Sequence, residues 1–395
     1  MNVYRTEAGL RHQLRDVLNF YYPACIDTAI GGYVAQLDER DGHVYDTRTR
    51  HLVATARGVG NFSLGVLVGG PDWCRFAAEH GLGFLSAAHW DPENGGYDWI
   101  LDGRETTDAA RHCYGHAFVL LAGARAHRAG IHGGRAELER AYEVMDERFW
   151  EPEHGLYADE ASADWSSLSA YRDQNANMHA CEALLAAYEA TTQEKYLERA
   201  DTIAERFTRE VTRATDGLLW EHYTEGWEPD LEYNRERPRH QFRPWGYQPG
   251  HHVEWAKLLA LLYEHRPRER LLERARELFE TAVEIGWDEV HEGFYYTVDG
   301  DGEPVVADKY GWVHAEAIGA SALLSAHDES YLEWYDRLWS YAREHLINPK
   351  YGNWYERLTR EHERDGPNRG VAVEPGYHPL TNGWVAMEAL RNVHS

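Results

Sequence analysis

Cysteine and lysine are scarce in this chain of 395 residues, with four of each. The cysteines are far apart in the sequence and no two form a C-x-x-C pair, which argues against a disulfide framework or a zinc knuckle. Such usage suits a reducing compartment, so we expect a cytoplasmic protein. The cysteines are Cys25, Cys74, Cys113 and Cys181.

Positive charge is also in short supply. The chain has 40 Lys and Arg residues against 66 Asp and Glu residues, which gives a formal net charge of −26. Nucleic acids and anionic membranes are bound by clustered basic residues, so neither is an expected partner. No run of about 18 apolar residues is present, and residues 1–18 lack the apolar core of a signal peptide, so we expect no membrane segment.

Several motifs of known chemistry are missing. The sequence has no H-E-x-x-H zinc motif, no Walker A loop, no G-x-S-x-G elbow and no dinucleotide fingerprint. The spacing of histidines, cysteines and acids indicates no metal site, and we expect neither a metal nor another cofactor. No Pro-, Gly- or Ser-rich linker divides the chain, so we expect one domain, residues 1–395.

Aromatic side chains are abundant instead, with 15 Trp and 25 Tyr. Aromatic rings stack on the apolar C–H faces of sugars, which is compatible with a carbohydrate site. The alternative is that the large rings fill a wide helical core. The composition agrees with both interpretations.

A short turn signature, in which an aromatic residue follows a glycine within three positions, recurs six times. Successive signatures are about 59 to 76 residues apart, so six units of about 64 residues account for nearly the whole chain. The signatures are Gly31-Gly32-Tyr33, Gly95-Gly96-Tyr97, Gly155-Leu156-Tyr157, Gly217-Leu218-Leu219-Trp220, Gly293-Phe294-Tyr295 and Gly352-Asn353-Trp354.

Helical hydropathy patterns fill the segments between the signatures. Each unit pairs a less polar helix with a more charged one, which predicts about twelve helices. The less polar helices are expected at 107–129, 175–190, 251–263, 312–325 and 381–393, and the charged ones at 137–150, 194–211, 268–287 and 330–346. The first two pairs, 11–24 with 51–68 and 71–89 with 108–129, fit the pattern less cleanly.

Six helical hairpins that close into a ring form an (α/α)6 barrel, and we predict this all-α fold. The less polar helix of each pair would line the inside, and its charged partner would cover the outside. The segments 33–45 and 295–306 alternate enough to predict short β-hairpins at one rim. An open solenoid is the alternative, although the chain shows no polar caps at its ends.

The strongest candidate site is the segment 243–255. Pro249-Gly250 predicts a turn and the apolar run after it predicts a helix, so His251 falls in the first helical turn. His251 and Glu254 are three residues apart and share a helix face, where a carboxylate can orient an imidazole and raise its basicity. Such a histidine suits proton abstraction next to a carbonyl. The alternative is a His–Glu capping arrangement without chemistry.

Other segments also place polar groups at expected helix starts. Asn175 or Asn177 can cap the helix that contains His179. Arg57 stands among small and apolar residues, where a guanidinium is costly unless it is paired. It suits hydrogen bonding to sugar hydroxyls or to a developing enolate oxygen. For His179 and Arg57 the alternative is a structural contact with a neighbouring helix.

The last two units add further candidates. His378 lies just before a helix start, and ring closure would bring it near the first inner helix. Glu316 belongs to the start of the inner helix in the fifth unit, and His116 has a similar position in an earlier unit. For His116 and for His314, core packing is the alternative to contact with a ligand.

These motifs resemble the N-acylglucosamine 2-epimerase family over nearly the full length of the chain. Within the family, the chain is most similar to the branch of mannose isomerases and sulfoquinovose isomerases, and the cellobiose 2-epimerase branch matches less well. The resemblance implies an (α/α)6 barrel that interconverts free sugars without a metal or redox cofactor. It is most specific at Pro249-Gly250-His251 with Glu254-Trp255, at Asn175-Ala176-Asn177-Met178-His179, and around Arg57 and His378.

The resemblance also implies roles for individual residues. Arg57 would bind substrate oxygens and stabilise the enediolate, while His251 and His378 would form the acid/base pair. Glu254 would orient or polarise His251. The candidates for sugar binding are His179 and Arg243, with Arg237 and Arg239 as close alternatives to Arg243, and in addition Asn175, Trp312, Glu316 and His116.

The expected reaction is aldose–ketose isomerisation of a free monosaccharide, D-mannose to D-fructose, with D-lyxose to D-xylulose as a further case. Ring opening and loss of the C2 proton would give a cis-enediolate, which takes up a proton at C1. A sugar 2-epimerase of the mannose/glucose or N-acylglucosamine type and a sulfoquinovose isomerase are alternatives. The expected partner is the monosaccharide, bound by a monomer or homodimer.

A different class of enzyme shares the expected fold. Glycoside hydrolases on (α/α)6 barrels need two opposed carboxylates about 5–10 Å apart, for which Asp173 and Glu316 are candidates. A carbohydrate-binding protein without activity is a third interpretation. The histidine-rich segments favour proton transfer over both.

Overall fold

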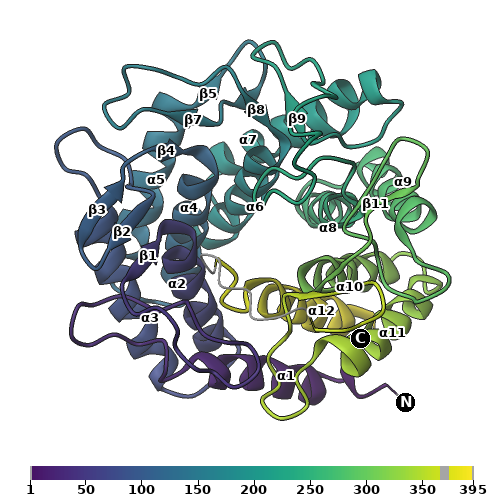
Figure 1. Ribbon diagram of the computed structural model, residues 1–395, viewed down its shortest axis with the longest axis horizontal. Coiled ribbons are helices and arrows are strands. Elements are labelled where there is room, and N and C mark those ends of the chain that lie inside the picture. The colour runs from purple at the N-terminus through teal and green to yellow at the C-terminus, as the bar shows by residue number, and fades with distance from the viewer. Residues whose placement is uncertain (1, 365–372, 394–395) are drawn as a thin grey trace.

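Twelve α-helices form a ring in the computed structural model, which describes residues 2–364 and 373–393 (Figure 1). The inner helices are α2 (Leu52–Leu67), α4 (Cys113–Arg128), α6 (Gln174–Thr191), α8 (Pro249–His265), α10 (Gly311–Ser325) and α12 (Tyr377–Val393). The outer helices are α1 (Glu7–Tyr21), α3 (Trp73–Phe84), α5 (Gly134–Arg148), α7 (Glu194–Glu205), α9 (Glu269–Gly286) and α11 (Tyr331–Tyr341). Short 3₁₀ or π segments flank four of the outer helices: Val3–Arg5, Leu85–His89, Arg206–Glu210, Val211–Thr215 and Ala342–Leu346.

Hydropathy separates the two rings of helices. The inner helix α2 buries fourteen of its sixteen residues. The outer helix α9 buries one face only, at the helical spacing of Leu271, Ala275, Leu278 and Ala282. The predicted (α/α)6 barrel with its less polar helices inside is therefore confirmed. Within the described part of the chain, no helix is long and apolar enough to cross a membrane.

Helices joined by short connections pack as antiparallel pairs. α2 packs against α3, α4 against α5, α6 against α7, α8 against α9 and α10 against α11. The ends of the chain close the ring, because α1 packs against α12, as Figure 1 shows in purple and yellow. The expected pairings of the first helix with the second and of the third with the fourth are wrong. Residues 68–72 suffice to join α2 to α3, whereas the connection from α1 to α2 spans 22–51.

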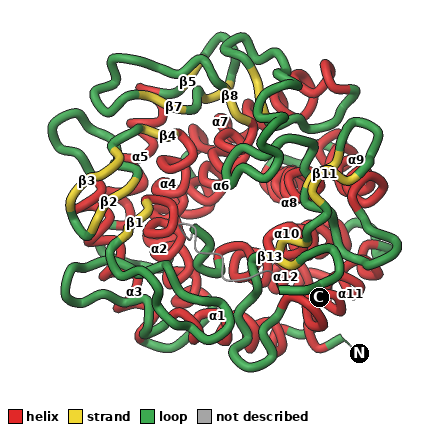
Figure 2. The backbone as a smooth tube through the Cα atoms, viewed as in Figure 1, coloured by secondary structure: helices red, strands yellow, loops and turns green. Residues whose placement is uncertain are grey.

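Short antiparallel strands lie where the inner helices begin and are spaced around the ring (Figure 2). The segment 295–306 forms the predicted hairpin. The segment 33–45 has isolated bridges in place of two strands, one between Leu37 and Val44 and one from Tyr33 to Ile26. β1 (Thr49–His51), β4 (Arg111–His112), β8 (Arg172–Asp173) and β12 (Lys309–Tyr310) each end directly before an inner helix. Their partners and the remaining hairpins are β2 (Ile100–Asp102), β3 (Glu105–Asp108), β5 (Trp150–Glu151), β6 (Leu156–Tyr157), β7 (Glu160–Ala161), β9 (His222–Tyr223), β10 (Thr297–Val298), β11 (Pro304–Val306) and β13 (Arg357–Leu358).

Candidate active site

The first turns of the inner helices surround a cavity of about 210 Å³. The second and sixth residues of a helix lie about 40° apart around its axis, so both face the barrel interior, whereas the fourth faces away. Four residues that line the cavity are the second residues of their helices: Tyr114, Asn175, Trp312 and His378. Three more are the sixth residues of their helices: Arg57, His179 and Glu254. Rim segments add Arg239, Phe242, Gln248, Tyr296, Tyr310, Glu356 and Glu374.

Arg57 presents a fixed positive charge to this cavity. Its side chain is 2% exposed, and its guanidinium carbon lies 4.2 Å from the ring centroid of Phe118 and 4.7 Å from that of Tyr377. Nη1 donates to Glu374, and Nη2 donates to the hydroxyl of Tyr114. Because it is stacked and desolvated, this guanidinium is a strong partner for an anionic oxygen.

His378 lies between two carboxylates. Its Nδ1 donates to Glu316 over 2.6 Å, and its Nε2 is 3.4 Å from Glu374. Burial disfavours the charged ring, but the two carboxylates outweigh burial and raise the pKa of His378 to about 9. The ring is therefore an imidazolium at neutral pH and has a proton to give to a bound oxygen.

Glu316 lies behind the cavity and supports His378. Its buried carboxylate accepts hydrogen bonds from His378, Lys257 and Asn382. Burial opposes its charge, but Lys257 and His378 outweigh burial and lower the pKa of Glu316 to about 2. The expectation that Glu316 binds sugar needs correction, because this carboxylate reaches the cavity only through His378.

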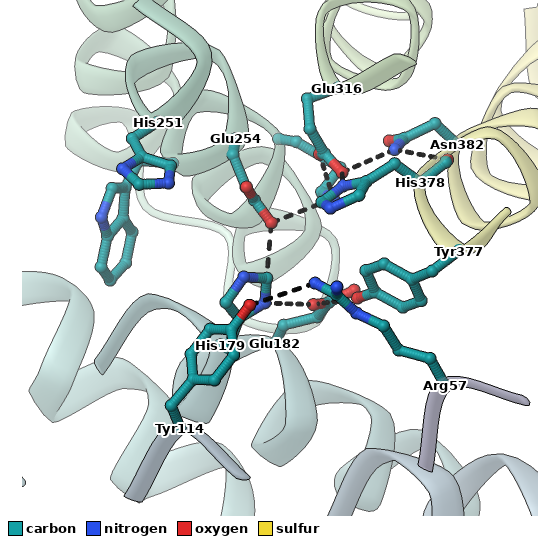
Figure 3. Close-up of polar contacts among 12 residues, drawn as sticks. Arg57, Tyr114, His179, Glu182, His251, Glu254, Glu316, Tyr377, His378 and Asn382 are labelled. Atoms are coloured by element: carbon teal, nitrogen blue, oxygen red, sulfur yellow. Dashed lines mark hydrogen bonds and ion pairs between the residues drawn. The ribbon is translucent and has the colours of Figure 1, made fainter. Parts of the chain in front are cut away.

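Glu254 and His179 both line the cavity, and Figure 3 shows their side chains pointing toward each other. Glu254 Oε1 is 3.8 Å from His179 Nδ1, and neither Glu254 oxygen has a hydrogen-bond partner among the described residues. Burial and the charge of Glu316 raise the pKa of Glu254 to about 8. Burial lowers the pKa of His179 to about 4 in spite of its bond to Glu182. At neutral pH a protonated carboxyl and a neutral imidazole therefore face the cavity.

His251 is oriented by a residue that the sequence did not reveal. Its Nδ1 lies 2.8 Å from Glu221 and 2.6 Å from the side-chain amide nitrogen of Gln174, which also donates to Glu221 at 3.1 Å. The expectation that Glu254 orients His251 is wrong, because Glu254 is turned toward His179. In the tautomer that donates its Nδ1–H to Glu221, the basic nitrogen of His251 is Nε2.

Trp312 lies between the two candidate acid/base histidines. Its ring centroid is 5.2 Å from that of His251 and 5.6 Å from that of His378, and both pairs are tilted by 39°. A flat indole in this position suits stacking against the C–H face of a sugar. A sugar bound on it would have one imidazole toward each end.

Arg243, which was expected to bind sugar, is not part of the cavity wall. Its guanidinium pairs with Asp159 at 2.8 Å and with Glu160 at 3.0 Å. Arg239, the neighbouring alternative, does line the cavity. The structure therefore favours Arg239 over Arg243 as a group that meets a ligand.

His116 is likewise separated from the cavity. It is fully buried, its Nδ1 donates to the carbonyl of His112 over 2.7 Å, and its Nε2 accepts from the backbone N–H of Tyr97 at 3.2 Å. As the fourth residue of α4 it faces away from the barrel interior. The expected contact of His116 with sugar is wrong, because the backbone takes both of its ring nitrogens.

The carboxylates proposed for a hydrolase are not opposed across the cavity. Asp173 caps α6 by accepting from the backbone N–H of Ala176 at 3.1 Å. Neither Asp173 nor Glu316 lines the cavity. The geometry therefore gives no support to hydrolysis by this pair.

Two overlapping groups of side chains have the composition of a metal site. The donor atoms of each group lie within 4.8 Å of one another. The ammonium of Lys257 lies among them, bonded to Glu316 and 4.0 Å from Glu254. The groups are His179, Glu182 and Glu254, and Glu254, Glu316 and His378.

Comparison with known proteins identifies relatives of this chain. Residues 31–381 match the family described as N-acylglucosamine 2-epimerase (GlcNAc 2-epimerase). The D-mannose isomerase of Marinomonas mediterranea is 40% identical over 96% of this chain and 97% of the relative. That of Thermobifida fusca is 39% identical over 83% of this chain and 80% of the relative. A crystal structure of a D-mannose isomerase matches with a TM-score of 0.94 at 38% identity, covering 97% of this chain and 98% of that one.

Proposed function

The chain belongs to the N-acylglucosamine 2-epimerase family, and from this premise we propose that it is an aldose–ketose isomerase that converts D-mannose to D-fructose. Relatives that match nearly its whole length are D-mannose isomerases. The cavity supports a small substrate, because its volume of about 210 Å³ lies below the range of about 300–1,000 Å³ in which drug-sized ligands bind.

The observation that carries the proposal is a pair of histidines on one small cavity, each held at Nδ1 by a carboxylate. His378, held between Glu316 and Glu374, has a proton to give. His251, held at Nδ1 by Glu221, offers Nε2 as a base. Isomerisation needs both, since one proton leaves carbon while another reaches oxygen.

Glu374 marks the place that a sugar oxygen would take. Its Oε1 contacts Arg57 as well as His378, so two cations converge on one oxygen atom. A sugar oxygen that displaces Glu374 from that position would have its developing negative charge stabilised by both cations, while His378 keeps its bond to Glu316. This arrangement suits an enediolate better than it suits a neutral hydroxyl.

The reaction then follows in three steps. His378 gives a proton to the ring oxygen as the C1–O5 bond breaks and then takes up the proton of the C1 hydroxyl, which produces the open-chain aldehyde and restores the imidazolium. His251 removes the C2 proton, a C1=C2 double bond forms, and the C1 oxygen becomes an enediolate oxygen beside Arg57. His251 returns the proton to C1, and the C2 hydroxyl proton passes by way of His378 to the C1 oxygen. This leaves a C2 carbonyl and a C1 hydroxyl, which is the ketose.

The test is incubation of the purified protein with D-mannose in D₂O and EDTA, followed by NMR and sugar chromatography. Fructose is the expected first product. Glucose as the first product would instead indicate a 2-epimerase. No turnover of mannose, lyxose, glucose or sulfoquinovose would contradict an isomerase of small sugars.

We further propose that the enzyme acts in the cytoplasm as a monomer or homodimer. All four cysteines are buried free thiols, and such usage suits a reducing compartment. Analytical ultracentrifugation measures the number of chains in solution.

A further inference from the structure

A buried lysine lies among the acid/base residues. Lys257, the ninth residue of α8, is 1% exposed. Its ammonium bonds to Glu316 and lies 4.0 Å from Glu254. Burying an ammonium is costly unless carboxylates surround it, so this lysine has a specific environment rather than a general packing role.

The donors around Lys257 would suit a divalent cation. They come from four inner helices, and carboxylates with imidazoles at such spacing bind ions such as Mn²⁺ or Zn²⁺. Glu254 belongs to both groups, and both of its buried oxygens lack a hydrogen-bond partner in the described part of the chain. The donors are His179 and Glu182 from α6, Glu254 from α8, Glu316 from α10 and His378 from α12.

We propose that Lys257 is a positioning residue whose ammonium serves as the internal cation of this cluster, in the place that a divalent metal ion would fill. The proposal rests on the isomerase function above, because the cluster includes His378. Lys257 does not line the sugar cavity. It acts through Glu316, whose carboxylate it holds against the ring of His378.

A second cavity, of about 460 Å³, reaches the cluster from the opposite end of the barrel. Lys257 and Glu182 line it together with apolar residues such as Leu185 and Leu261. Without the lysine side chain, a cation could therefore enter the cluster from this cavity while the sugar cavity keeps its own lining.

The test compares the full-length wild type with Lys257→Met, Lys257→Arg and Lys309→Met. Lys309 is a matched control, because it is a buried lysine paired with Asp288 at 3.0 Å outside the cluster. In Mn²⁺ titrations followed by EPR, Lys257→Met is expected to bind one ion per chain at least about tenfold more tightly than the wild type or Lys309→Met. With D-mannose, kcat of Lys257→Met is expected to fall about 10- to 100-fold at little-changed KM. Lys257→Arg should recover most of that loss.

Equal Mn²⁺ binding by the wild type and Lys257→Met would overturn the proposal. The proposal would also be overturned if Lys257→Met lowered the melting temperature as much as Lys309→Met but left kcat unchanged. If Lys257→Met does not fold, Lys257→Gln keeps a donor to Glu316 without the charge and carries the same test. The Mn²⁺ titration does not depend on turnover. If Lys257→Met bound Mn²⁺ tightly while the wild type was inactive on D-mannose, the isomerase function would be contradicted and the role of Lys257 as internal cation would stand.

Discussion

Two neighbouring histidines on α8, His251 and His252, serve two regions of the molecule. Both are buried, at 5% and 0% exposure. His251 bonds to the carboxylate of Glu221 and lines the cavity. His252 bonds to the backbone at both ring nitrogens, to the carbonyl of Gln248 at 2.8 Å and to the N–H of Leu219 at 3.1 Å. Adjacent side chains on a helix point about 100° apart, so one turn can face both the cavity and the rim.

The backbone bonds of His252 recur around the ring. In four inner helices the fourth residue bonds to the carbonyl four residues earlier and accepts from the N–H that follows a glycine turn. These contacts tie the first turn of the helix to the rim. They also fix cavity residues that lie two positions away, which are Tyr114, Asn175, His179, Glu254 and Trp312. We name these residues the backbone clamp: His116, Asn177, His252 and His314. The clamp histidines are structural, because backbone groups occupy both ring nitrogens. The cavity histidines His251 and His378 are available for chemistry, because carboxylates hold their rings.

The largest effect is expected from the cavity histidines. His251→Gln or His378→Gln should lower kcat by about 10²- to 10⁴-fold, because each removes one of the two groups that move protons. Steady-state kinetics with D-mannose measure the loss, and urea denaturation should show that the variants remain folded. Near-normal kcat in either variant would contradict its role as acid or base.

The clamp should respond in the opposite way. His252→Ala leaves a cavity and two unpaired backbone groups, which should lower the free energy of unfolding by about 3–5 kcal/mol. The kcat of the folded fraction should be nearly unchanged. His252→Asn is the matched variant, because Asn177 makes the same contacts in α6, and it should recover part of the lost stability. A His252→Ala protein with normal stability and low kcat would reverse the distinction between clamp and cavity.

Much of the fold can be predicted because glycine turns and hydropathy are local signals. Helix starts are less certain: the helix expected at 107–129 begins at Cys113, since residues 111–112 form β4. A closed ring could be predicted, but the pairing of α1 with α12 could not, because the two helices are at opposite ends of the sequence and no local pattern links them.

The cavity residues could be proposed from sequence because they are polar groups at the starts of apolar helices. Glu221 could not, since it lies in a rim loop before β9 and outside any helix. A weak signal exists, because Asp159, Glu221 and Glu356 each follow the glycine of a turn signature by four residues. The roles of His116 and His251 differ by one helical position, so an error of one residue in a helix start exchanges clamp and cavity.

A smaller effect is expected from the partner of His251. Glu221→Gln should lower kcat about 10- to 100-fold, because an amide neither fixes the Nδ1–H tautomer nor stabilises the imidazolium. KM should change little, because Glu221 does not line the cavity. Glu254→Gln is the control, because Glu254 lines the cavity. This substitution should raise KM more than Glu221→Gln does. Identical kinetics in the two variants would contradict the assignment of Glu221 to His251.

The smallest expected effect is a difference in how the two kinds of histidine respond to pH. Burial lowers the pKa of His252 to about 4, below the unfolded value of about 6.5. Its contribution to stability is therefore present above about pH 6.5 and is lost as the pH falls toward 4. The neighbouring carboxylates outweigh burial and raise the pKa of His378 to about 9. Its contribution is present below about pH 6.5 and is lost as the pH rises through 9.

Urea denaturation from about pH 4 to 9 measures both windows, in which each group changes the free energy of unfolding by at most about 1.4 kcal/mol per pH unit. His378→Gln should lose less stability than the wild type on the alkaline side, and His252→Gln should lose less on the acid side. Parallel curves for the wild type and His378→Gln above about pH 6.5 would mean that this ring is already neutral, and His378 could then not be the acid that opens the sugar ring. The comparison needs no substrate, so it separates the chemical histidine from the structural one even before turnover is measured.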